Sequence, residues 1–314
     1  ILMGLLNTAM ISSAGVAAIS AVSMVDSLNL FIINVFVALA TGGTVIVAQY
    51  KGAGNEAMVP RAAAQTLTAV TVSAVLISAV VIAFRKETLT LLFGGAEPEV
   101  FAYATIYLVA SCLSYPLLAV YQAVAGVLRG VAESKATLAL SMIMNVSFFL
   151  LNLLFLLALD MGVMGLSISL ILARFIGMTT SLVYLIKINH SLRFRMRNAL
   201  SIDLMLVRKI LYIGIPFAAE QLFFNGGKLL TQTFIVQIGT PALTANAIGN
   251  TMFMLFHIVS TALSVAVVTV VGQCIGSGDI EDARKFTWSF ILLSTWSFLV
   301  SAVIILPLFP LIVR

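Results

Sequence analysis

The feature that most constrains this chain of 314 residues is a series of eight long apolar runs separated by short polar segments. A membrane-spanning helix needs about 20 predominantly apolar residues, and each run is long enough to cross a bilayer. The runs cover residues 17–49, 61–84, 101–128, 136–158, 163–187, 210–237, 241–273 and 285–310. The sequence therefore predicts an all-α, polytopic membrane protein. We interpret a shorter run at 1–11 as the end of a truncated first span, because the sequence opens on an isoleucine.

Composition excludes other broad classes of protein. Hydrophobic residues make up 61% of the chain and charged residues 9%, whereas about a quarter of the residues in a soluble domain are charged. The continuous apolar runs exclude an outer-membrane barrel, whose strands alternate polar and apolar residues. An intramembrane enzyme needs clustered catalytic groups, but the two histidines and the acids at membrane depth are scattered along the chain. We therefore expect neither an enzyme nor a bound cofactor.

The positive charges predict how the chain lies in the membrane. Twelve of the 17 lysines and arginines lie in the loops and helix ends that follow every second span. Because basic loops stay on the cytoplasmic side, we expect this side to be cytoplasmic and the protein to lie in the plasma (inner) membrane. The basic segment 191–209 is predicted to be a cytoplasmic linker at the lipid headgroups. The positive net charge thus indicates membrane orientation and no nucleic-acid partner.

An internal repeat divides the chain into two lobes. At an offset of 224 residues, a Val-x-Gln-x-x-Gly-x-Gly pattern recurs, pairing Gln49 with Gln273, Gly52 with Gly276 and Gly54 with Gly278. The offset crosses an even number of spans, so both copies point the same way, as in the parallel repeats of secondary transporters. We predict a two-lobed bundle of parallel six-helix repeats, here incomplete. Its parts are an N-terminal lobe at 1–190, the linker at 191–209 and the start of a C-terminal lobe at 210–314. We interpret the repeated glycines as helix ends rather than as a phosphate-binding loop.

Three stretches resemble the MATE (multidrug and toxic compound extrusion) transporters. They are ALATGGTVIVAQYKGAGN at 38–55, GVLRGVAESKATLALSMIMNVSFFLLN at 126–152, and GIPFAAEQLFFNGGKLL followed by GTPALTANAIGN and VVGQCIGSGD. The resemblance runs in order along nearly the whole chain, from the end of family helix one to helix nine. It implies a V-shaped bundle of two six-helix lobes that opens alternately to each side and expels organic cations against an H⁺ or Na⁺ gradient.

We therefore expect a secondary active antiporter that exports cationic or amphipathic small molecules, such as drugs, toxins or metabolites, in exchange for H⁺ or Na⁺. Its partners would be a small-molecule substrate and the lipid bilayer, and we expect a monomer. An alternative is a flippase for lipid-linked oligosaccharide or polysaccharide of related architecture, in which several arginines should line the cavity. A channel fits less well, because parallel repeats favour alternating access.

Four ionisable residues lie at membrane depth, where each costs about 2.5–3.5 kcal/mol if it faces lipid. Glu220 follows Pro216 by four residues, and the resemblance implies an essential acid in this helix, so we predict that Glu220 binds the coupling ion. A structural ion pair between Glu220 and Lys228 is the alternative. Asp26 is a second ion-coupling candidate, with an ordinary interfacial aspartate as its alternative. Arg174 is predicted to be a structural clamp held by carboxylate or carbonyl partners.

A polar stripe on the 210–237 helix predicts the lining of a substrate cavity. At about 100° per residue, four polar side chains fall on one face of this helix, and they are Gln221, Asn225, Lys228 and Gln232. Asn34 lies on a polar face of the 17–49 helix and is predicted to line the same cavity. The alternative for the stripe is hydrogen bonding between helices. We expect no metal site.

Overall fold

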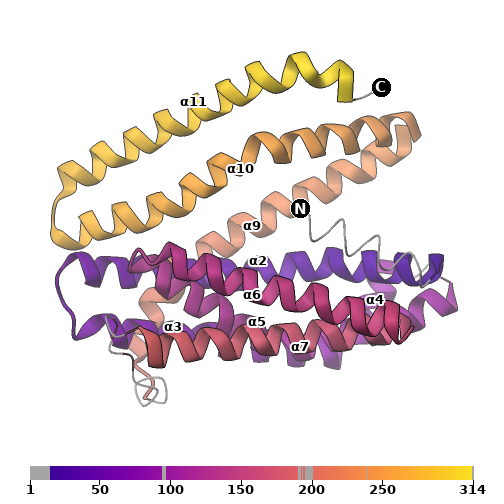
Figure 1. Cartoon of the computed structure of the whole chain (residues 1–314), viewed down its shortest axis with the longest axis horizontal. Coiled ribbons are helices and arrows are strands. Elements are labelled where there is room, and N and C mark those ends of the chain that lie inside the picture. Colours follow the sequence, from indigo (N-terminus) through magenta and orange to yellow (C-terminus); the bar gives the residue numbers. More distant parts are fainter. Residues whose placement is uncertain are drawn as a thin grey trace.

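The computed structural model describes residues 15–93, 97–189, 192, 194, 201–238 and 240–312. Every regular element among these residues is helical, which confirms the predicted all-α fold. Two helices end in a π-helical segment, and the predicted run at 1–11 lies outside the described residues. The elements in chain order are α2 (Val16–Gly52), α3 (Met58–Ala83), α4 (Arg85–Phe93), α5 (Pro98–Gly130), α6 (Ser134–Asn152), η2 (Leu153–Ala158), α7 (Gly162–Val183), η3 (Tyr184–Ile188), α9 (Leu204–Ile238), α10 (Thr240–Ser277) and α11 (Ile280–Ile312) (Figure 1).

All eight predicted spans form helices. Among the described residues, 7 helices are long and apolar enough to cross a membrane. α9 is not one of these, and several of its side chains lie outside the described part of the structure. The short helix α4 was not predicted, because its charged first residues end the apolar run that forms α3.

The helix that follows the predicted linker starts inside it. α9 begins at Leu204, so the last residues of the predicted 191–209 linker are helical. The backbone N–H groups of Met205 and Leu206 donate to Oδ1 of Asp203 over 3.0 and 3.2 Å. An aspartate in this position satisfies amide groups that the start of a helix leaves free, which explains the earlier start. The division at 190 and 210 into lobes otherwise stays a prediction.

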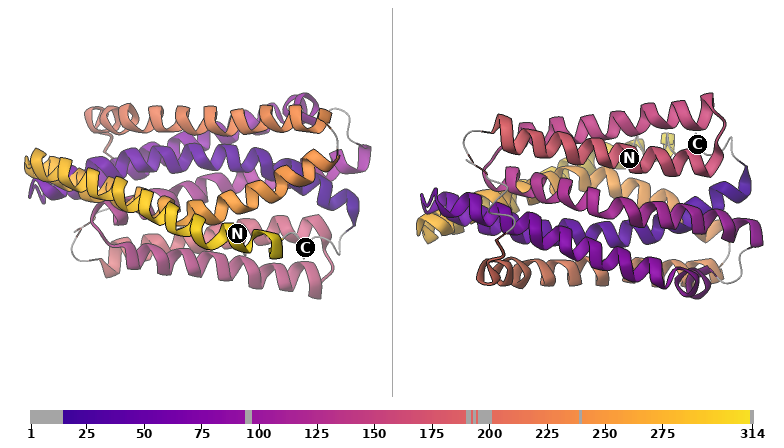
Figure 2. Two further views of the ribbon diagram at one scale, coloured as in Figure 1. Left: turned by 90° about the horizontal axis from the view of Figure 1, so that it is seen from above. Right: turned by 90° about the horizontal axis from the view of Figure 1, so that it is seen from below.

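The helices form two groups that we call the first lobe (α2 to α7 with η3) and the second lobe (α9 to α11). Within the first lobe, α5 packs against α2, α3 and α7. α10 and α11 form an antiparallel pair that leans away from the first lobe (Figures 1 and 2). The first half of α9 lies along α2, where Gly42 faces Gly214 closely enough that a Cβ at Gly42 would lie 2.8 Å from the Gly214 nitrogen. Such small residues let helices approach at the backbone.

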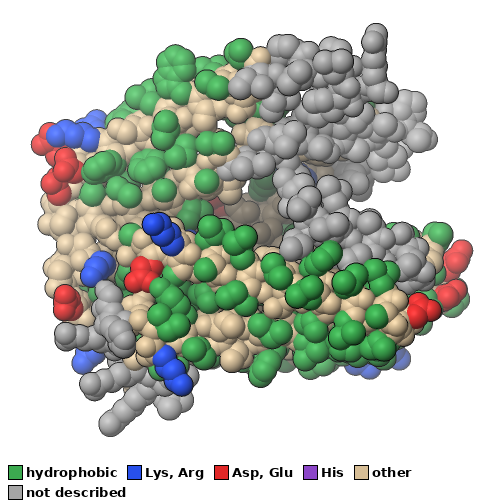
Figure 3. All heavy atoms as spheres, viewed as in Figure 1, with side chains coloured by type: hydrophobic (Ala, Val, Ile, Leu, Met, Phe, Trp, Pro, Cys, Tyr) green, Lys and Arg blue, Asp and Glu red, His purple; other side chains and the backbone are tan. Residues whose placement is uncertain are grey.

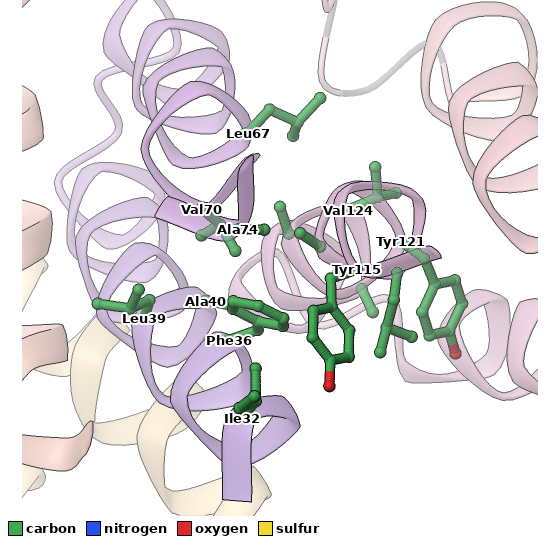
Figure 4. Close-up of a cluster of buried hydrophobic side chains, with 14 of the residues drawn as sticks. Ile32, Phe36, Leu39, Ala40, Leu67, Val70, Ala74, Tyr115, Tyr121 and Val124 are labelled. Atoms are coloured by element: carbon green, nitrogen blue, oxygen red, sulfur yellow. The ribbon is translucent and has the colours of Figure 1, made fainter. Parts of the chain in front are cut away.

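The core of the first lobe lies where α2, α3 and α5 meet. Ile32 and Phe36 of α2 belong to one buried cluster with Val70 of α3 and Tyr115 of α5 (Figure 4). The ring centroids of Phe36 and Tyr115 are 5.6 Å apart, edge to face, an arrangement that aromatic pairs favour. This packing fixes α5 against α2, and these two helices carry most of the polar groups of the first lobe described below.

The two copies of the repeat end their helices in the same way. Gly54 and Gly278 both have left-handed backbone angles, with φ of 66° and 83°. After α2, the N–H of Gly54 donates to the Lys51 carbonyl (3.1 Å) and that of Asn55 to the Tyr50 carbonyl (3.1 Å). After α10, the matching donors are Gly278 to Ile275 (3.2 Å) and Asp279 to Cys274 (3.0 Å). The predicted helix-ending role of these glycines is confirmed, because glycine adopts positive φ without strain.

The two lobes touch at one end of the molecule, which we call the closed end. A Cβ added at Gly52 would overlap the backbone carbonyl of Gln273, and one added at Gly276 would overlap the carbonyl of Gln49. The second contact repeats the first, since Gly276 and Gln49 are the repeat mates of Gly52 and Gln273. Beyond this contact the lobes diverge, and Figure 3 shows a hollow between them. The repeat therefore forms the contact that holds one end together.

Two side chains of α10 also fasten it to the end of α5. The hydroxyl of Thr269 donates to the Arg129 carbonyl over 2.9 Å, and Nε2 of Gln273 donates to the Gly130 carbonyl over 3.1 Å. Both carbonyls belong to the last turn of α5, whose carbonyl groups lack partners within their own helix. The closed end is thus joined by hydrogen bonds as well as by close packing.

Candidate functional site

A cavity lies between the two lobes, on the open side of the closed end. It encloses about 280 Å³, and both lobes contribute to its walls. Its lining residues are Asn34, Val37, Ala38, Thr41 and Thr44 of α2, Arg129 of α5, Phe217, Glu220 and Gln221 of α9, and Thr261, Ser264, Val265 and Val268 of α10. Of these 13 residues, 8 carry polar or charged side chains and 5 are apolar, so the cavity offers both the apolar surface and the polar groups that a small-molecule site combines.

The cavity brings together three of the residues that the sequence predicts. Asn34 faces it from the first lobe, and Glu220 and Gln221 face it from the second. The alternative pairing of Glu220 with Lys228 is wrong, because the salt bridges among the described residues involve neither of them. Lys228 lies eight residues further along α9, which is about 12 Å of helix. Glu220 is therefore the carboxylate that this cavity presents.

Asp26 belongs to a polar network inside the first lobe. Its Oδ1 accepts hydrogen bonds from the Tyr107 hydroxyl (2.9 Å) and from Nδ2 of Asn29 (3.1 Å). The Tyr115 hydroxyl in turn donates to Oδ1 of Asn29 over 2.6 Å, and Nδ2 of Asn29 donates to the Ser111 hydroxyl over 3.1 Å. Asp26 thus faces α5 and is held by polar partners. The structure does not bring it to the cavity that holds Glu220.

Arg174 extends the same network from α7. It is 8% exposed, and its Nη1 donates to the Ser114 hydroxyl over 2.6 Å. Its guanidinium carbon lies 5.9 Å from the centre of the Tyr115 ring. Its direct contacts are a hydroxyl and an aromatic face, both from α5, and the carboxylate of Asp26 attracts it electrostatically. A guanidinium can hold the hydroxyl and the ring at once, because it is planar and donates from its edge.

Comparison with models of known protein families assigns the chain to one of them. A family model described as MatE matches residues 1–156 and 216–314, which is most of the chain. The chain belongs to the MatE family. This membership confirms the resemblance found in the sequence. The family consists of transporters rather than enzymes, and together with the apolar helices it identifies the MatE chain as part of an integral membrane protein.

Individual relatives agree with this assignment. The uncharacterized transporter YisQ of Bacillus subtilis (strain 168) is 26% identical over 288 residues, which cover 90% of this chain and 62% of that protein. The probable multidrug resistance protein NorM of Thermotoga maritima is 26% identical over 319 residues, which cover 98% of this chain and 66% of NorM. The chain thus spans less than two thirds of the length of both relatives.

A solved structure shows the same fold. It is described as the outward-facing conformation of a multidrug resistance MATE family transporter of the MOP superfamily. It matches the MatE chain with a TM-score of 0.89 at 17% sequence identity, over 97% of this chain and 67% of that one. The two-lobed bundle predicted from the repeat is therefore the architecture of this family.

Several cavity residues of the MatE chain were missed by the sequence reasoning. Arg129 was assigned to the basic loop side, yet its side chain lines the cavity. Its Nε donates to the Ala125 carbonyl over 3.1 Å, which turns the side chain back along α5. Thr41 could have been found, because it lies seven residues after Asn34 and hence on the same face of α2. Thr261 and Ser264 could not be found in this way, because none of the predicted site residues lies on α10.

Two described residues of the predicted stripe, Asn225 and Lys228, are not part of the cavity lining. Asn225 donates from Nδ2 to the Gln221 carbonyl of its own helix over 2.8 Å. The ammonium of Lys228 lies over the aromatic rings of Phe224 and Phe253. The side chain of Gln232 lies outside the described part of the structure. Of the predicted stripe, Gln221 therefore lines the cavity, whereas Asn225 and Lys228 lie further along α9.

Proposed function

We propose that the protein is an antiporter that exports cationic or amphipathic small molecules in exchange for H⁺ or Na⁺, with Glu220 as the ion-coupling residue. The observation that carries this proposal is the position of Glu220 in a cavity walled by both lobes. Membership of a transporter family supports export, and the name of NorM, a probable multidrug resistance protein, supports drugs and toxins as the substrate class.

A single carboxylate in this cavity can serve two cations in turn. Without a bound ion, the negative charge of Glu220 attracts an organic cation, and the apolar wall around Phe217 and Val265 holds its hydrocarbon part. When H⁺ or Na⁺ reaches the carboxylate, this attraction is lost and the organic cation leaves. The amide of Gln221 and the hydroxyl of Thr261 lie in the same wall and offer hydrogen bonds to either occupant. Mutually exclusive occupancy therefore couples the two movements.

The closed end supports alternating access. For the cavity to open to the opposite side of the membrane, the contacts of Gly52 with Gln273 and of Gly276 with Gln49 must separate. The loops at this end include the basic ones that the charge rule assigns to the cytoplasm. On this orientation the cavity faces the outside of the plasma membrane. We further propose that the protein works there as a monomer, with no cofactor besides the coupling ion.

Asp26 is proposed as a second ion-coupling residue within the first lobe. Tyr107 and Asn29 donate to the same carboxylate oxygen, so they hold the carboxylate in a fixed position, and among the described residues no hydrogen bond is made to its other oxygen, which we propose meets the ion. Arg174 is proposed to act as a clamp, because it holds Ser114 and Tyr115 of α5 in the positions that complete this network.

The test is efflux of a fluorescent organic cation from liposomes that contain the full-length protein, under an imposed pH gradient or Na⁺ gradient. We expect one gradient to accelerate efflux by wild-type protein and Glu220→Gln to abolish that acceleration, because an amide neither releases a proton nor balances a cation. The matched control is Glu99→Gln, which changes an exposed acid in the first turn of α5.

Two results would count against the proposal. Undiminished gradient-driven efflux by the Glu220→Gln variant would remove Glu220 from the coupling step. Wild-type protein that moves no organic cation under either gradient would favour the flippase alternative, for which the same liposomes would be assayed with a lipid-linked oligosaccharide. The cavity lining includes one arginine, Arg129, whereas that alternative predicts several.

A further inference from the structure

The wall of the cavity continues toward the open end of the molecule. On α9, Phe217, Glu220 and Gln221 line the cavity, and at about 100° per residue Phe224 and Lys228 fall on the same face. On α10, Thr261 lines the cavity, and the same spacing puts His257 and Phe253 above it. Two cavity-facing stripes, one on each helix, therefore rise past Glu220 toward the open end.

An ammonium group is already seated between the upper ends of these stripes. Nζ of Lys228 lies 4.7 Å from the centre of the Phe224 ring and 5.4 Å from the centre of the Phe253 ring. Both distances are within the range of a cation–π contact. Among the described residues, no salt bridge competes for this ammonium. The two rings, one from each helix, thus hold a positive charge without a carboxylate.

Hydrogen bonding and ring contact connect this pair of rings to the cavity wall. The rings of Phe253 and His257 have centroids 5.1 Å apart, and Nδ1 of His257 lies 2.7 Å from the hydroxyl of Thr261, which lines the cavity. Lys228 and both phenylalanines are also exposed rather than enclosed. The ammonium can therefore leave the rings for water, which makes the rings available to another cation.

We propose that Phe224 and Phe253 form a second binding site for the organic ammonium group of the substrate, and that Lys228 is its tethered competitor. This inference rests on the proposed export of organic cations and adds a position on the exit path. A substrate that leaves Glu220 displaces the Lys228 ammonium from the rings. When Lys228 returns, it expels the substrate toward the open end, so the lysine lowers affinity where release is required.

The test measures binding of benzyltrimethylammonium to the full-length protein by calorimetry, because a quaternary ammonium keeps its charge at every pH. Lys228→Met should tighten binding about fivefold or more, since the competitor that occupied the site is removed. In the Lys228→Met background, Phe253→Leu should weaken binding about two- to fivefold, the worth of one cation–π contact. Lys209→Met, which removes an exposed lysine near the start of α9, is the matched control and should change nothing.

Two comparisons make the result decisive. Neopentylbenzene, the uncharged carbon analogue of the probe, should also bind Lys228→Met more tightly than wild-type protein, because a lysine that occupies the rings excludes any ligand from them, whereas charge repulsion would weaken binding of the ammonium alone. Unchanged or weaker ammonium binding in Lys228→Met overturns the proposal, and so does a Phe253→Leu change without effect in that background, because simple charge repulsion would then explain the lysine. If either of these binding results fails while gradient-driven efflux persists, only the second site is refuted, and the role of Glu220 and the proposed function are unaffected. If gradient-driven efflux by wild-type protein is absent, the proposed function itself is refuted.

Discussion

Replacing Gly52 with alanine tests whether the repeated glycines hold the closed end together. Gly52 is the last residue of α2, and a Cβ there would overlap the backbone carbonyl of Gln273. The obstacle is backbone rather than the end of a flexible side chain, so relief requires the two helices to move apart. Alanine itself favours helix over glycine, and any loss of the closed conformation therefore comes from the contact between the lobes.

The size of the effect follows from the overlap. Forcing an extra methyl group into a well-packed interface costs about 1–3 kcal/mol, and each 1.4 kcal/mol changes an equilibrium about tenfold. The ratio of closed to separated molecules should therefore fall by about fivefold to 150-fold. Spin labels at the exposed positions Lys51 and Ser277 would measure this by pulsed dipolar spectroscopy, with Cys274 replaced by alanine. We expect a second, longer distance to grow in Gly52→Ala, and equally in Gly276→Ala.

Two variants separate this effect from a general disturbance. Gly227→Ala changes a glycine of α9 whose added Cβ would meet no described atom within 4 Å, and it should leave the distances unchanged. At Gly272 an added Cβ would lie 2.9 Å from the Cβ of Ala48, so Gly272→Ala should open the closed end and adding Ala48→Gly should restore it. A folded Gly52→Ala protein with the wild-type distance distribution would refute the reasoning.

Two further predictions concern hydrogen bonds. Tyr115→Phe keeps the ring contacts but removes the hydroxyl that donates to Asn29, so it should lower the free energy of unfolding by about 1–3 kcal/mol. Thermal unfolding would measure this change, with Tyr212→Phe, which alters an exposed tyrosine, as the control. An equal effect in both variants would contradict a role for the network. Thr269→Val removes the hydrogen bond to the Arg129 carbonyl and should shift the closed-end equilibrium by about 0.5–1.5 kcal/mol toward separation. The same spin-label pair measures this shift, and an unaltered distribution would show that packing alone holds that end.

Much of the fold could be predicted because it depends on patterns along the chain. Lipid requires continuous apolar helices, so the eight runs marked the helices, and the matched glycines marked where two of them end. The start of α9 could not be placed from hydropathy, because the carboxylate of Asp203 decides it by capping the first amide groups. The matching contacts of Gly52 and Gly276 were likewise hidden, since they depend on how the two lobes meet.

The site was predictable only in part, because it depends on contacts between helices. Glu220, Gln221 and Asn34 could be selected, since polar groups within apolar helices turn away from lipid. The direction of Arg129 could not, because a hydrogen bond to Ala125 turns its side chain toward the cavity instead of outward to water. The partners of Lys228 were also out of reach, because the Phe253 ring comes from a different helix.

The central claim is that one cation leaves as another enters, and ion movement driven by substrate tests it most directly. The full-length protein would be placed in liposomes without any ion gradient, an organic cation would be added outside, and internal pH and Na⁺ would be recorded with fluorescent indicators. We predict that the inward substrate gradient drives either H⁺ or Na⁺ outward in wild-type protein and that Glu220→Gln carries no such ion current. Substrate uptake by wild-type protein with no opposing movement of either ion would contradict it.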